Sequence, residues 1–140
     1  MVKKILVFIV IAFAAILIGC GGNITNRKDQ HRENYPDFDQ YQFNTEVLIN
    51  GAKATPASLA QYSIKAGDQV ELRPIWSKSD GSIVAAPPNI IYESGATDAV
   101  VNKTGPFEFV ATNRGETILY LRAHRGDPFG WSQSVPIKIE

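Results

Sequence analysis

The chain has 140 residues, enough for one domain of ordinary size and a targeting segment. Its 14 basic and 14 acidic residues give zero formal net charge, which argues against bulk attraction to nucleic acid. Its one cysteine, Cys20, lies at the end of an apolar segment, so packing alone must hold the folded part without disulfides.

The first twenty residues have the layout of a bacterial export signal. A short positive start, Lys3 and Lys4, precedes an unbroken apolar run over residues 5–18. A helix that spans a bilayer needs about 20 apolar residues, so this shorter run is typical of a signal peptide. We therefore expect residues 1–19 to be a cleaved leader.

The end of this leader, Leu17-Ile18-Gly19-Cys20, resembles the lipobox of bacterial lipoproteins. In that family the cysteine thiol receives a diacylglycerol, the leader is cleaved before the cysteine, and the new amine is usually acylated. The resemblance implies a lipidated Cys20 and a bilayer partner, since two or more acyl chains anchor a protein stably. Gly21 stands where an aspartate would indicate inner-membrane retention, so the outer membrane is favoured if the cell has two. An uncleaved N-terminal helix with an incidental cysteine is the alternative.

Residues 20–40 are expected to be the lipidated cysteine and a flexible tether. The segment after the cysteine is polar, contains one aliphatic residue, Ile24, and shows neither a strand nor a helix period. Such a segment buries too little apolar surface to offset its ordering entropy. A flexible coil of this length reaches on the order of 25 Å, which would lift a following domain clear of the lipid headgroups.

The remaining residues, 41–140, have the texture of an all-β domain. Short alternating apolar segments are separated by Gly, Pro, Asn and Asp at roughly ten-residue spacing. The expected strands cover residues 45–50, 58–64, 69–76, 89–93, 99–102, 107–111, 117–123 and 135–139. Pro74 lacks a backbone donor, which predicts an edge or a bulge in the third of these strands. Two packed antiparallel sheets would bury the apolar faces best.

Several short motifs also follow one another in a set order over this domain. They are Gly67–Leu72, Asp80-Gly81, Ile91–Ser94, Ala99–Val101 with Gly105, Ala111 with Gly115, Ile118–Ala123 and Val135–Ile139. This order resembles the bacterial immunoglobulin-like domains of group 2. The resemblance implies an immunoglobulin-like antiparallel β-sandwich, with Tyr92 as the aromatic core residue where that family commonly has tryptophan. Such domains are usually modules of bacterial surface proteins, and some bind host or matrix partners.

The sequence offers no convincing catalytic set or metal site. The one cysteine is the expected lipid site, and neither zinc-ligand spacing nor a phosphate-binding glycine loop is present. A Ser-His-Asp set could be imagined from His124, Asp127 and Ser132 or Ser134, but nothing suggests an oxyanion hole. We therefore expect a protein that is not an enzyme and that takes no cofactor or metal.

The stretch Ala123–Gln133 lies between the last two expected strands and is rich in turn residues. Loops at the end of a sandwich often carry binding residues, and Trp and Arg are common hot-spot residues. The candidate binding residues are His124, Arg125, Asp127, Phe129 and Trp131. The alternative is that Phe129 or Trp131 folds back to cap the open end of the core.

These features predict a non-catalytic, membrane-anchored lipoprotein of the cell envelope whose immunoglobulin-like domain binds a protein or serves in envelope assembly. Carbohydrate binding is the alternative. The final hairpin weakly resembles that of small calcium-dependent galactose-binding lectins of bacteria, but the residues near the places of their calcium ligands are Ala123, Gly130 and Trp131. No nucleic-acid partner is expected, because without Lys3 and Lys4 twelve basic residues stand against fourteen acidic ones.

Overall fold

The computed structural model describes residues 38–57, 60–126 and 130–140. The expected signal peptide over residues 1–19, Cys20 and the expected tether up to residue 37 lie outside the described residues. From Gln40 to Glu140 the chain forms one compact unit, and both of its sheets lie within it.

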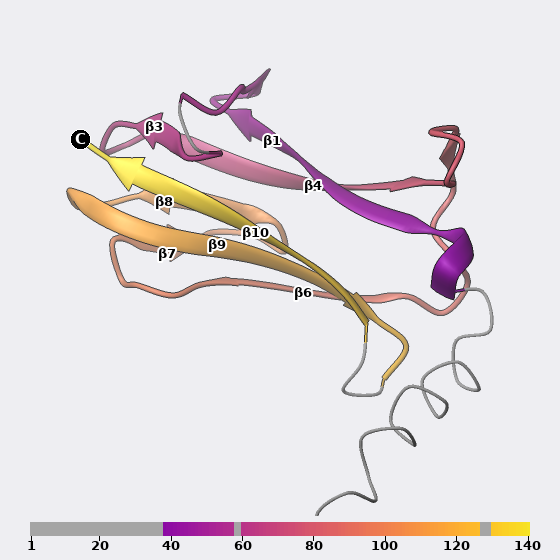
Figure 1. The fold of residues 1–140 in the computed structure, drawn as a ribbon. Coiled ribbons are helices and arrows are strands. Elements are labelled where there is room, and N and C mark those ends of the chain that lie inside the picture. Colours follow the sequence, from indigo (N-terminus) through magenta and orange to yellow (C-terminus); the bar gives the residue numbers. More distant parts are fainter. Residues whose placement is uncertain (1–37, 58–59, 127–129) are drawn as a thin grey trace, which may run out of the picture. The chain divides into compact units, whose positions relative to one another are not determined.

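The described residues are almost entirely β-structure (Figure 1). In chain order the elements are a short 3-10 helix η1 (Phe38–Gln40), β1 (Gln42–Ile49), β2 (Ala52–Lys53), β3 (Tyr62–Ile64), β4 (Gln69–Ser77), β5 (Ile83–Val84), β6 (Ile91–Ala96), β7 (Val101–Lys103), β8 (Glu108–Ala111), β9 (Gly115–His124) and β10 (Gly130–Ile139). The expected all-β fold class is confirmed. Within residues 38–57, 60–126 and 130–140, no helix has the length and apolar character needed to cross a membrane.

The strands form two sheets. The first has the order β2-β1-β4-β8-β7, with β5 also paired to β4, and the second has the order β3-β10-β9-β6. All pairings are antiparallel except that of β3 with β10, which is parallel. Without the short strands β2, β3 and β5, this is the A-B-E-D and G-F-C order of a constant-type immunoglobulin sandwich.

Apolar alternation explains which face of each long strand is buried. On β4 the side chains of Val70, Leu72 and Trp76 are buried on one face, as the sequence predicts. On β9 the alternating residues Leu119 and Leu121 are completely buried. Because these strands belong to different sheets, their apolar faces supply the two halves of one core.

The position of Pro74 within β4 confirms the predicted edge. On one side β4 pairs with β1 along its whole length, with Thr45 opposite Pro74. On the other side β8 pairs only with residues 69–71, and β5 pairs only with residues 76–77. The backbone N–H of Leu72 donates to Phe107 O on that second side. Residues two apart on a strand direct their backbone nitrogens to the same side, so the nitrogen of Pro74, which carries no hydrogen, faces a position where neither β8 nor β5 pairs.

Several strand boundaries differ from the expectation. Of the segment expected at 58–64, the described residues 60–64 form a strand only at β3, and β6 and β7 begin two residues later than expected. The largest difference is at β10, which begins at Gly130 rather than at Val135. Gly130 pairs with His124 and Trp131 pairs with Ala123, so half of the expected loop is a continuation of the β9–β10 hairpin.

Candidate binding surface

The structure describes three of the five candidate residues of the expected loop. His124 is the last residue of β9, Arg125 is half-buried beside it, and Trp131 is the second residue of β10. Asp127 and Phe129 lie outside the described residues. Of the three described candidates, His124 and Trp131 are buried and Arg125 is half-buried, so these three do not form an exposed binding surface.

Trp131 belongs to the core. Its side chain is only 7% exposed, and its ring meets that of Trp76 edge to face at a centroid distance of 4.9 Å. Trp76 in turn packs against Phe43 at 4.9 Å and donates from Nε1 to the hydroxyl oxygen of Tyr92 at 2.8 Å. This corrects the expectation of Trp131 as an exposed contact: it caps the core, which is the alternative the sequence left open.

His124 is held by the hairpin itself. Its side chain is buried, and its Nδ1 accepts a hydrogen bond from the backbone N–H of Gly126 at 3.0 Å. Its Nε2 lies 3.3 Å from Glu93 Oε1 without the geometry of a hydrogen bond. Glu93 Oε2 accepts from Arg122 Nη1 at 3.3 Å. The imidazole is therefore buried and bonded within its own hairpin, with Nε2 beside Glu93 of β6.

A different surface, on the outer side of the second sheet, exposes apolar side chains. Ile91 on β6 is 50% exposed, and Ile118 and Tyr120 on β9 are 42% and 41% exposed. The inward positions of β9 are already filled by buried residues, so its outward side chains Ile118 and Tyr120 are surplus to the core. We call this surface the Tyr120 face and define it by the outward residues Ile91, Glu93, Gly95, Ile118, Tyr120, Arg122, Ser132, Ser134 and Pro136.

The centre of the Tyr120 face is a tyrosine ring laid across a glycine. Tyr120 pairs with Gly95 on β6 and with Ser134 on β10. A Cβ atom at Gly95 would collide with the hydroxyl and ring atoms of Tyr120, so the phenol end lies against the glycine backbone. A glycine within a strand costs about 0.5–1 kcal/mol relative to alanine. Here that residue is what lets the ring lie along the sheet.

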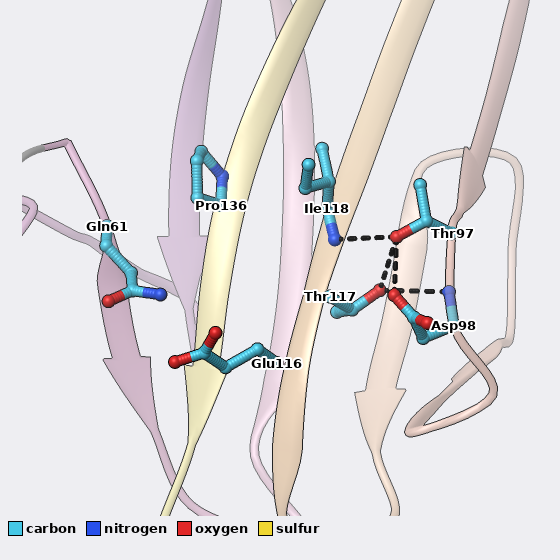
Figure 2. Close-up of a pocket in the computed structure, with 7 residues that line it drawn as sticks. All are labelled: Gln61, Thr97, Asp98, Glu116, Thr117, Ile118 and Pro136. Carbon is cyan, nitrogen blue, oxygen red and sulfur yellow. Dashed lines mark hydrogen bonds between the residues drawn. The ribbon is translucent and has the colours of Figure 1, made fainter.

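A shallow pocket of about 330 Å³ opens beside Ile118 (Figure 2). It is lined by Gln61, Thr97, Asp98, Glu116, Thr117, Ile118 and Pro136. The Thr97 hydroxyl accepts from the backbone N–H of Ile118 at 3.1 Å and donates to Asp98 Oδ2 at 2.6 Å. The backbone N–H of Asp98 donates to the buried Thr117 hydroxyl at 3.2 Å. These bonds fix one wall of the pocket.

The opposite wall is less constrained. Figure 2 shows the Glu116 carboxylate and the Gln61 amide extending toward each other beside Pro136. Neither side chain is hydrogen-bonded to another described residue, so both can serve a ligand. Among residues 38–57, 60–126 and 130–140, no three His, Cys, Asp or Glu side chains are grouped as metal ligands would be. The pocket therefore offers hydrogen-bonding oxygens and an amide beside an apolar floor.

The pattern of apolar residues in one expected strand could have indicated this surface from the sequence alone. In the expected strand 117–123 the residues on the face opposite Leu119 and Leu121 include Ile118 and Tyr120, which are also apolar. A strand with one solvated face normally places polar residues there. Two apolar residues at solvent-facing positions therefore indicate either a covered or a binding face.

Comparison with known proteins identifies no family for the chain. No protein-family model matches it, and no curated protein matches it. The likenesses to lipoproteins and to bacterial immunoglobulin-like domains therefore rest on the residues quoted for them.

Proposed function

We propose that the chain is a lipid-anchored protein of the bacterial cell envelope, and that its β-sandwich is a non-catalytic domain that binds an envelope or extracellular partner. The observation that carries the binding role is the Tyr120 face, where three large apolar side chains are 41–50% exposed on one side of one sheet. The neighbouring side chains Ile118 and Tyr120 support an interaction surface, since adjacent exposed apolar groups on one face favour binding over a role in spacing alone.

The anchoring role is supported by the first twenty residues. The positive start, the apolar run and the stretch Leu17–Cys20 fit the order of a lipoprotein signal. Acylation at Cys20 would place the sandwich at the membrane surface, where partner binding gains from a fixed location. A location at the outer membrane, if the cell has two membranes, follows from Gly21 as the next residue.

The anchor is tested with the full chain expressed in a bacterium that is fed radiolabelled palmitate. We expect label in the unchanged chain and recovery of that chain in the membrane fraction. The Cys20→Ala variant should lose the label and either leave the membrane fraction or stay unprocessed, because the acceptor thiol is gone. The matched control, Asn23→Ala, should behave like the unchanged chain. Normal cleavage and membrane association of Cys20→Ala would refute the anchor.

A further inference from the structure

The Tyr120 ring has small neighbours on both sides. Gly95 lies on one side of it, and Ser134 lies opposite it on the other strand. Ser132 and Ser134 are both exposed on the outward side of β10, because the alternating residues Trp131 and Val135 point into the core. The paired positions carry no large side chain and Tyr120 is 41% exposed, so part of the ring is open to a flat ligand. Arg122, the next outward residue of β9, is ion-paired with Glu93 at 3.3 Å.

The surroundings of the ring are mostly polar. Along the face, Ile118 and Pro136 continue the apolar surface into the pocket, whose rim carries the Gln61 amide and the Asp98 and Glu116 carboxylates. Asp98 is oriented by Thr97, as described above. Lys138, directly opposite Glu116, is paired with Glu140 at 3.7 Å. The surface thus combines one aromatic platform with several hydrogen-bonding groups around it.

This combination matches the chemistry of a sugar chain. A hexose ring has a face of C–H groups, which suits the electron-rich face of an aromatic ring, and an edge of hydroxyls, which suits carboxylates and amides. The outward positions around Tyr120 are Gly95, Ser134, Ile118 and Arg122, so polar and small groups outnumber the apolar walls that an apolar peptide side chain would need. Two carboxylates at the pocket also disfavour sugars that carry phosphate or carboxylate groups.

We propose that the Tyr120 face is a glycan-binding site for an uncharged polysaccharide of hexose units, with Tyr120 as the stacking platform and Asp98, Glu116 and Gln61 as the hydroxyl-binding groups. This inference rests on the proposed binding role of the domain and names its ligand class. It does not depend on Cys20, so failure of the anchor and failure of glycan binding are distinguishable.

The test uses the full chain in a zwitterionic detergent that contains no sugar, with cellohexaose, chitohexaose and maltohexaose as the probes in calorimetric titrations. We expect at least one probe to bind. Tyr120→Ser should weaken that binding about tenfold or more, because the platform is removed. Tyr120→Phe should stay within about threefold, because it keeps the ring. The control Ile83→Ser, at an exposed site on β5 of the other sheet, should bind like the unchanged chain.

A second measurement covers the case in which Tyr120→Ser does not fold. In the unchanged chain, addition of the bound probe should shift the amide resonances of Tyr120, Ser132 and Ser134 in nuclear magnetic resonance spectra. Absence of binding to all three probes at millimolar concentration would overturn the inference. So would binding whose shifts fall outside the Tyr120 face, or self-association of the chain that Tyr120→Ser abolishes.

Discussion

At the scale of single residues, the aromatic cluster around Trp76 decides how the open end of the sandwich is closed. Trp76 contacts three other rings, those of Tyr41, Phe43 and Trp131, and it donates to Tyr92. These partners come from β1, β6 and β10 or lie beside them, so one indole joins the two sheets. An aromatic pair contributes roughly 0.5–1.5 kcal/mol beyond the burial of its area.

Trp131 is the member of this cluster that the sequence suggests as a binding residue and that the structure buries. Its burial predicts that Trp131→Ala lowers the free energy of unfolding by about 3–5 kcal/mol, as loss of a buried aromatic does. The exposed neighbour Ser132 provides the control, since Ser132→Ala should change that free energy by no more than about 0.5 kcal/mol. Urea unfolding followed by tryptophan fluorescence measures both. A folded Trp131→Ala protein of unchanged stability would contradict the core assignment.

At the scale of elements, alternation predicted the strands whose two faces differ and failed where turn residues lie inside a strand. β4 and β9 were found because buried and solvated positions alternate along them. The start of β10 was missed because Asp127, Pro128 and Gly130 are turn-forming types. A Cβ at Gly130 would collide with the carbonyl oxygen of Ala123, so the close approach of two backbones explains this glycine. Prediction of the Tyr120 face would have required the pairing register of β6 and β9, which places Gly95 opposite Tyr120.

The side chains of Asn50 and Asp68 join two turns, the one that follows β1 and the one that precedes β4. The Asn50 amide donates from Nδ2 to Asp68 Oδ1 at 2.8 Å and accepts from the backbone N–H of Gln69 at 2.9 Å. Asp68 Oδ2 accepts from the backbone N–H of Lys65 at 2.8 Å. Asn50 adopts a positive φ of 51°, a conformation that asparagine tolerates well. This clamp ties the end of β1 to the turn between β3 and β4.

The clamp makes stability depend on pH in the acid range. The hydrogen bond from Asn50, and then that from the Lys65 backbone, hold the pKa of Asp68 below its ordinary value of 3.8. A lowered carboxyl pKa stabilises the fold fully above the ordinary value, and this contribution is lost as the pH falls through the folded-state pKa. Asp68→Asn should therefore be less stable than the unchanged chain at neutral pH, with the difference shrinking below about pH 3.8.

Urea unfolding between pH 2 and pH 7 measures this difference between the two proteins. Asp39→Asn, which alters an exposed carboxyl outside the clamp, should show the pH profile of the unchanged chain. A constant difference in unfolding free energy between Asp68→Asn and the unchanged chain over the whole range would show that the charge of Asp68 has no part in the clamp.

At the scale of the whole molecule, both sheets contribute an apolar face to one buried core. Residues of both sheets form the buried core, and the largest fully buried side chains are Leu72, Phe109, Leu119, Leu121 and Ile137. The one cysteine, Cys20, lies before the compact unit, so no covalent crosslink can contribute to it. The parallel pairing of β3 with β10 was beyond sequence reasoning, because it joins segments more than seventy residues apart.

Since the buried core of the described residues lies in the compact unit, we expect the fragment 38–140 to fold without the preceding residues. We expect its thermal midpoint to lie within about 3 °C of that of the full chain, because each kcal/mol shifts the midpoint of a domain this size by about 4–8 °C. The fragment 38–129 should not fold. It lacks β10, which lies between β3 and β9 in the second sheet and carries the buried Trp131, Val135 and Ile137. Circular dichroism during heating measures both fragments. A cooperative transition in 38–129, or a loss of more than about 8 °C in 38–140, would mean that the stabilising contacts of the chain lie elsewhere.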